Sequence, residues 1–177
     1  MMLRVLTPFL ALAAACSTSG APVAPAAPAA APAPTPTAIA FAYDDADCNL
    51  GTVLRPGVPG SPGHLMVSDR NPNGDSELAV LMRGFVADLE AARLQVRAGG
   101  APSPMFEHHR AMRCAWPTNP AERNAAYDQR AQAYLYAVRQ FEATPNRDSY
   151  NAIVTNCVAC HTASCAGVVP LIEQLRW

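Results

Sequence analysis

The chain has 177 residues, which is enough for one domain with accessory segments. Its 13 basic residues, all of them arginines, nearly balance its 14 acidic ones. This balance excludes the basic stripe of a nucleic-acid-binding protein, and we therefore expect no nucleic-acid partner.

Residues 1–16 have the pattern of a bacterial export signal. Arg4 supplies a positive charge, and residues 5–15 form an apolar run that is too short for a permanent membrane span. The segment resembles a lipoprotein signal, although Ala13 stands where that signal usually has a branched apolar residue. The resemblance implies that Cys16 is lipidated and anchors the protein on the periplasmic side of a bacterial membrane. Plain cleavage near the same position is the alternative.

Two further segments precede the helices. Residues 17–40 are almost entirely Ala, Pro, Ser and Thr, which predicts a disordered tether. At about 3.1 Å per residue it would reach roughly 70 Å at most. A leader without a role is the alternative. Residues 41–75 are rich in Gly, Pro, Asn and Asp, which predicts irregular structure.

A helical domain is predicted over residues 76–177. Asp75 or Ser76 is a good N-cap for its first helix, and Gly99 with Gly100 marks the end of that helix. Between them, apolar residues recur on one face with the helical period: Leu78, Leu81, Met82, Phe85, Leu89, Ala92 and Val96. This pattern predicts an amphipathic helix with one buried face.

More helices are predicted in the second half of the domain. A short helix over residues 104–114 precedes one that is capped by Asn119 and begins with Pro120. Another runs from about Asn146 to His161, and a short last helix covers residues 169–175. Amphipathic helices with short connections favour an all-α fold, an antiparallel four-helix bundle. An irregular all-helical domain is the alternative.

The sequence Cys157-Val158-Ala159-Cys160-His161 is a C-x-x-C-H motif within the predicted fourth helix. This spacing is the signature of covalent haem attachment. Two thiols three residues apart on a helix reach the two vinyl groups of a porphyrin, and the imidazole that follows is a strong axial ligand of haem iron. We therefore expect one haem c, attached through Cys157 and Cys160 with His161 on the iron.

Two other chemistries use a similar motif. A thioredoxin-like redox pair follows a strand in a βαβ unit, and no such unit is predicted here. A zinc site would combine Cys157, Cys160, His161 and Cys165. Adjacent helical residues such as Cys160 and His161 point about 100° apart, which is awkward for one tetrahedral ion.

With this motif in its last long helix, the chain resembles the class II cytochromes c, the cytochrome c′ family. The resemblance covers residues 76–177 and rests on residues 78–85, 150–161 and 165–175. It implies a four-helix bundle with haem near the end of the chain, and roles in electron transfer or in binding small gases. The helical region is shorter than usual, and Cys165 stands where the family often has an arginine.

The sixth iron ligand is left open. Met82 is the first candidate, because class II cytochromes place their distal residue on this stripe of the first helix; a core methionine is the alternative. His108 or His109 comes next, although the surrounding pattern looks solvated. His64, in the Gly- and Pro-rich segment, is the weakest candidate.

Three cysteines remain once Cys16 and the two haem cysteines are set aside. An odd number in an oxidising compartment predicts one disulfide and one thiol. We expect Cys165 to form a disulfide with Cys114 or Cys48.

The predicted function is one-electron transfer, without enzymatic activity. The sequence shows no paired carboxylates, no nucleophile with a base and no phosphate-binding loop. Binding or sensing of NO or CO at a five-coordinate haem is one alternative, and a structural lipoprotein without a cofactor is another. The expected partners are redox proteins and, through Cys16, the membrane, with homodimer formation left open.

Overall fold

The computed structural model of the protein describes residues 48–177. The predicted export signal, the tether and Cys16 lie outside the described residues, as does the start of the irregular segment. Within residues 48–177, none of the helices combines the length and apolar composition that crossing a bilayer requires.

The described residues form an all-α structure. The α-helices are α1 (Glu77–Arg97), α2 (Phe106–Arg110), α3 (Ala125–Ala143), α4 (Arg147–Ser164) and α5 (Val169–Glu173). Three short 3-10 helices join them: η1 (Ala111–Cys114), η2 (Pro120–Glu122) and η3 (Ala166–Val168). The β-type pairing seen in this part of the chain is an isolated bridge between Met66 and Asp75.

Side-chain caps start the three long helices. The Ser76 hydroxyl accepts a hydrogen bond from the Ala79 N–H at 3.2 Å and so starts α1 where the sequence predicted. α4 also starts where predicted, at about Asn146, and there Asn146 and Ser149 form a reciprocal capping box. α3 is different, because Asn124 caps it and it begins at Ala125.

The predicted start of the third helix was therefore wrong. Asn119 and Pro120 begin only the single turn η2, after which Arg123 leaves the helical conformation with ψ near 80°. The Arg123 guanidinium donates to the carbonyl oxygens of Arg113 and Asn49, at 3.2 and 2.6 Å. These contacts with distant segments hold the turn apart from α3. The predicted second helix is likewise shorter, because α2 tightens into η1 after Arg110.

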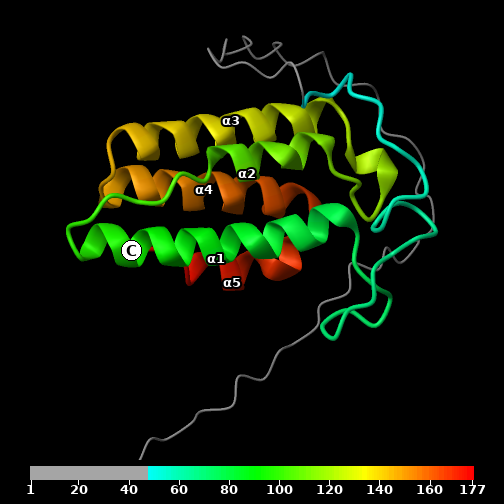
Figure 1. Ribbon diagram of the computed structural model, residues 1–177, viewed down its shortest axis with the longest axis horizontal. Coiled ribbons are helices and arrows are strands. Elements are labelled where there is room, and N and C mark those ends of the chain that lie inside the picture. The colour runs from blue at the N-terminus through cyan, green and yellow to red at the C-terminus, as the bar shows by residue number, and fades with distance from the viewer. Residues whose placement is uncertain (1–47) are drawn as a thin grey trace, which may run out of the picture.

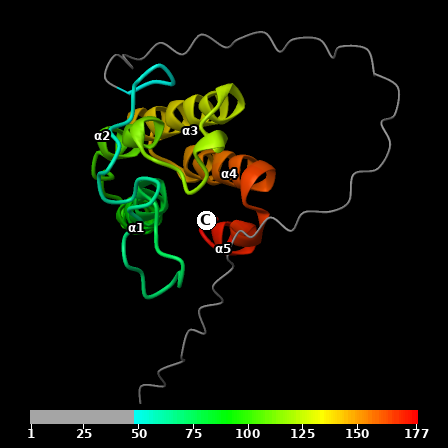
Figure 2. The ribbon, with the colours of Figure 1, turned by 90° about the vertical axis from the view of Figure 1, so that its right-hand side faces the viewer.

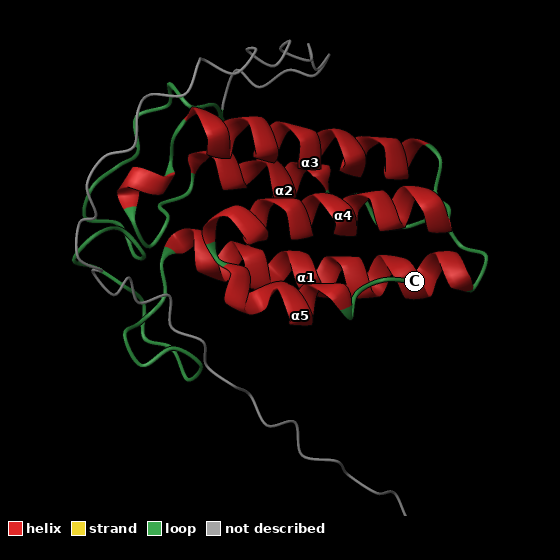
Figure 3. Ribbon diagram, turned by 180° about the vertical axis from the view of Figure 1, so that it is seen from behind, coloured by secondary structure: helices red, strands yellow, loops and turns green. Residues whose placement is uncertain are grey.

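α1 and α3 run in one direction, and α2 and α4 run in the opposite direction (Figures 1 and 3). α3 and α4 pack against each other along their length, α2 lies against α3, and α5 lies against α4. The backbone of α1 comes closest to η1. Figure 2, viewed along the helices, shows α1 below α2, and α5 on the side of α4 that faces away from α3.

The core is formed by the predicted faces of α1, α3 and α4. On α3, all six residues of the expected face are buried: Tyr127, Ala131, Tyr134, Leu135, Val138 and Phe141. On α4, Tyr150, Ile153 and Val154 are fully buried. The aromatic residues Phe85 and Phe141 also belong to this packed core.

Residues 48–75 wrap around one end of the helices. Gly60 passes directly over the start of α1, where its carbonyl accepts the Glu77 N–H at 3.3 Å. Its φ of +86° suits glycine, and a Cβ there would lie 2.3 Å from the Glu77 nitrogen. A disulfide joins Cys48 to Cys114 and fastens this segment to η1.

Candidate functional site

The C-x-x-C-H motif occupies the last turns of α4. Cys157 and His161 continue the face that carries the buried Tyr150 and Val154, since helical residues three, four, seven and eleven apart share a face. Burial nevertheless decreases along this face. Tyr150, Ile153 and Val154 are 0% exposed, whereas Cys157 and His161 are half-buried. The motif therefore lies where the helix face emerges from the core.

Both motif cysteines carry free thiols. Burial raises the pKa of Cys157 to about 12, to which the neighbouring Cys160 contributes. Burial also raises the pKa of Cys160, which the positive charge of Arg130 partly offsets. Both thiols are therefore uncharged near neutral pH.

The imidazole of His161 is half-buried, and burial lowers its pKa. Among residues 48–177, no side chain or backbone group forms a hydrogen bond with this ring. The other ring that is kept from solvent, His109, has both of its nitrogens engaged. Of these two rings, that of His161 is the one that could take a ligand without giving up a hydrogen bond to another described residue.

The first turns of α1 lie at the same end of the molecule as the motif. Because α1 and α4 run in opposite directions, the N-terminal half of α1 and the C-terminal half of α4 lie at the same end of the molecule (Figure 1). On α1, too, the burial of the apolar face decreases toward this end of the molecule. Phe85 and Leu89 are 3% and 1% exposed, but Leu78, Leu81 and Met82 are only half-buried against the core.

Two helices thus leave apolar surface incompletely covered at one end of the core. The half-buried side chains are Leu78, Leu81 and Met82 on α1, Cys157 and Val158 on α4, and Val168 on η3. A group that fits this end must be apolar and reachable by two thiols and one imidazole. A haem satisfies both conditions, since its ring is apolar, its vinyl groups take thiols and its iron takes an imidazole.

A polar pocket of about 320 Å³ adjoins the motif between the start of α3 and the end of α4. Its lining is formed by Glu122, Asn124, Ala126, Tyr127, Arg130, Ala163 and Ser164. Its polar lining distinguishes it from the apolar surface of α1 and α4. Arg130 belongs both to this pocket and to the surroundings of Cys160.

The predicted disulfide was wrong in its partners. Cys48 and Cys114 are bonded to each other, with Cα atoms 5.2 Å apart, so neither pairs with Cys165. Cys165 is half-buried directly after α4. The sequence could not choose among the three cysteines, because the return of residues 48–52 to η1 has no local signal.

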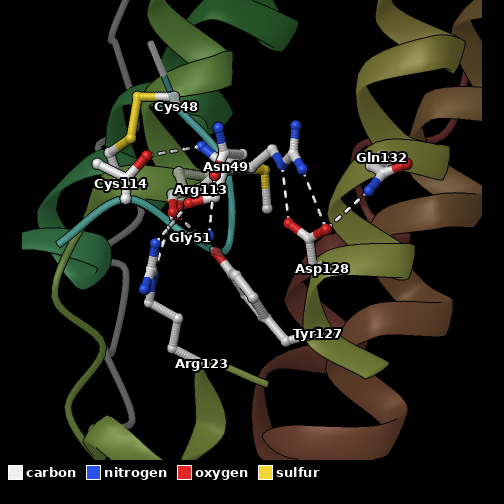
Figure 4. A network of polar contacts seen from close by, with 11 residues as sticks. Cys48, Asn49, Gly51, Arg113, Cys114, Arg123, Tyr127, Asp128 and Gln132 are labelled. Atoms are coloured by element: carbon white, nitrogen blue, oxygen red, sulfur yellow. Dashed lines mark hydrogen bonds and ion pairs between the residues drawn. A yellow bond between two sulfur atoms is a disulfide. The ribbon is translucent and has the colours of Figure 1, made fainter. Parts of the chain in front are cut away.

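A buried ion pair between η1 and α3 lies beside this disulfide and was not predicted from the sequence (Figure 4). Arg113, 2% exposed, donates from Nε and Nη2 to the two carboxylate oxygens of Asp128, at 2.8 and 3.0 Å. Gln132 donates to the same carboxylate at 2.7 Å. The Tyr127 hydroxyl donates to the Met112 carbonyl at 2.7 Å. These bonds fix η1 against the first turns of α3.

The histidines other than His161 fall into two groups. His64 is exposed in the N-terminal segment. His108 is exposed and His109 is 0% exposed, so the expectation that both are solvated was wrong for His109. Burial lowers the pKa of His109 to about 4, although Asp88 acts in the opposite direction. Its neutral ring stacks on Phe85 with centroids 4.1 Å apart.

His108 and His109 both contact Asp88 of α1. His108 Nδ1 lies 2.7 Å, and His109 Nε2 3.1 Å, from the same carboxylate oxygen, Oδ2. Asp88 is not one of the apolar residues that define the predicted face of this helix, and nothing in the sequence indicated that α2 would bring two histidines to it. Within the described part of the chain, these three residues form the group of His, Cys, Asp or Glu side chains whose donor atoms lie close enough together to bind one metal ion. The alternative zinc ligands around Cys157 do not converge in this way.

No protein-family model, characterised protein or solved structure matches the chain.

Proposed function

We propose that this protein is an exported c-type cytochrome that carries single electrons. One haem c would be held by thioether bonds from Cys157 and Cys160 and by the imidazole of His161. The observation that carries the proposal is the C-x-x-C-H motif itself, with free thiols, at the point where the apolar face of α4 leaves the core. When bound, haem supplies an iron that takes up and releases one electron.

The protein's own residues would hold and shield the group. The two cysteines would fix its position along α4, and His161, one residue further, would fix its orientation. Leu78, Leu81 and Met82 would cover it from α1 and exclude water, because they are apolar and only half-buried without such a neighbour.

We also propose that the fold is an antiparallel four-helix bundle of the class II cytochrome c type. In this assignment α1, α2 with η1, α3 and α4 are the four helices, and α5 is an addition at the C-terminus. The alternating directions of α1, α2, α3 and α4 along the chain and the position of the motif in α4 support the assignment.

Gas binding is the second candidate function. Met82 packs against the core from a half-buried position, which is also what a methionine does when it is not an iron ligand. If Met82 is not an iron ligand, the side of the haem opposite His161 would be an apolar space for a small uncharged gas. Binding of CO or NO to a high-spin haem supports the gas-binding protein. A low-spin haem, or a high-spin haem that binds neither gas, supports the electron carrier, since a five-coordinate haem can also carry electrons.

Extraction of denatured protein with acid–acetone tests the proposal. Thioether bonds are covalent, so colour should stay with the wild-type polypeptide, whereas the variant Cys157→Ala/Cys160→Ala should contain little haem. A matched control, Cys48→Ala/Cys114→Ala, removes two cysteines outside the motif and should keep its haem. Colour that passes from the wild-type protein into the solvent would contradict covalent attachment.

A further inference from the structure

We propose that Asp88, His108 and His109 form a binding site for a divalent transition-metal ion such as Zn²⁺, separate from the C-x-x-C-H motif. The three donor atoms come from two helices, α1 and α2, and lie within 4.8 Å of one another. This inference concerns a different ion and different residues, and it does not rest on the proposed haem.

The donor set suits a borderline divalent ion. Two imidazole nitrogens and one carboxylate oxygen are ligands that zinc accepts at about 2.0–2.2 Å, and sites with three protein ligands keep a fourth position for water. In the structure, both rings already aim a nitrogen at Asp88 Oδ2, at 2.7 and 3.1 Å. Small side-chain rotations would place an ion among the three atoms.

His109 is held in the orientation that a ligand needs. Its Nδ1 lies 2.6 Å from the hydroxyl of Tyr134 on α3, which leaves Nε2 directed at Asp88. The ring is 0% exposed and stacks on Phe85, so it cannot turn away. A partner on the second ring nitrogen is a regular feature of metal-bound histidines, because it fixes the tautomer and the ring orientation.

The position of His108 depends on a glycine. A Cβ at Gly84 would lie 2.9 Å from His108 Cε1, so the missing side chain lets this ring lie against α1. The side chains of His108 and Asp88 are 46% and 38% exposed, so an ion can reach them from solvent. The site thus combines one buried, fixed ligand with two accessible ones.

Charge also favours a cation here. Asp88 contributes a negative charge, and no Arg side chain bonds to it among the described residues. With an ion bound, the remaining ring protons would lie on His108 Nε2, toward solvent, and on His109 Nδ1, which would donate to Tyr134.

Titration calorimetry with Zn²⁺ on the purified full-length protein, previously treated with a chelator, tests the site. We expect one Zn²⁺ per chain in the wild type. Asp88→Asn and His108→Ala alter accessible side chains and should weaken binding by more than the roughly 10–100-fold cost of losing a hydrogen-bond partner of a ligand. His64→Ala and Asp69→Asn change an exposed histidine and an exposed aspartate elsewhere and should bind as the wild type does.

A Co²⁺ titration followed by visible absorption adds a readout of the ligands themselves, and circular dichroism checks that each variant is folded. Absence of Zn²⁺ binding in the wild type would overturn the proposal. Binding that survives unchanged in folded Asp88→Asn and His108→Ala would overturn it as well, because the ion would then lie elsewhere. The three residues would in that case only join α1 to α2 by hydrogen bonds.

Discussion

Met82 lies in the second turn of α1, half-buried and packed against the core. We expect Met82→Ala to lower the free energy of unfolding by about 2 kcal/mol, the lower end for truncating a buried Met. The haem spectrum should stay unchanged, and Leu81→Ala should behave similarly. A change to a high-spin spectrum with a lower reduction potential would instead identify Met82 as an iron ligand, because thioether ligation favours reduced iron.

Asp75 precedes the cap of α1 and is 4% exposed. Burial alone would raise its pKa, but hydrogen bonds from Arg83, Ser68 and Asn71, with the charge of Arg83, hold that pKa below its usual value. Such a carboxyl stabilises the fold above its unfolded pKa, and this contribution is lost as the pH falls through the folded pKa.

Asp75→Asn should therefore cost roughly 1.5–3 kcal/mol at neutral pH, as expected for losing hydrogen bonds to a charged group. The difference from the wild type should begin to shrink below about pH 4, the ordinary pKa of an unfolded Asp, and should disappear as the pH falls through the lower pKa of the folded state. Urea unfolding across this range measures both effects, with Asp69→Asn as the control. A difference that is independent of pH would show that the charge of Asp75 does not stabilise the fold.

At the scale of elements, helix periodicity and caps located α1 and α4 closely. Ser76 and Asn146 start these helices because their side chains satisfy local N–H groups, and local patterns suffice to predict that. The start of α3 could not be predicted, because Asn119 and Asn124 are both good caps. The choice between them depends on contacts of Arg123 with residues far away in sequence.

The disulfide between Cys48 and Cys114 joins positions 66 residues apart. Closing a loop of that length removes conformational entropy from the unfolded chain, so Cys48→Ser/Cys114→Ser should lower stability by about 4 kcal/mol. Denaturant unfolding of the two proteins measures the loss. The haem content should be unchanged, because the motif lies elsewhere. A loss below about 1 kcal/mol would show that the disulfide constrains the unfolded chain little.

At the scale of the whole molecule, the motif was visible in the sequence because Cys157, Cys160 and His161 are neighbours in the chain. The Asp88, His108 and His109 group was not, since it joins two helices. The apolar surface beside the motif was foreseen only as the stripe of α1. The incomplete burial of this surface follows from the packing of α1 and α4. That packing cannot be derived from the hydrophobic periodicity of the sequence.

The N-terminal segment predicts the cellular location of the protein. If Cys16 is lipidated, the wild-type protein should sediment with membranes, and Cys16→Ser should appear in the soluble periplasmic fraction. Ser17→Ala, which changes the neighbouring residue, should stay with the membranes. A wild-type protein that is already soluble would refute the lipid anchor and leave plain cleavage of the signal.

The most direct test of the account is the mass of one peptide. The chain contains no lysine, so trypsin cleaves after Arg147 and Arg176 and releases residues 148–176, with Cys157, Cys160 and Cys165, as a single peptide. After reduction and treatment with iodoacetamide, a c-type cytochrome should give the mass of this peptide plus one haem, with only Cys165 alkylated. A peptide without haem in which all three cysteines are alkylated would contradict the assignment as a c-type cytochrome.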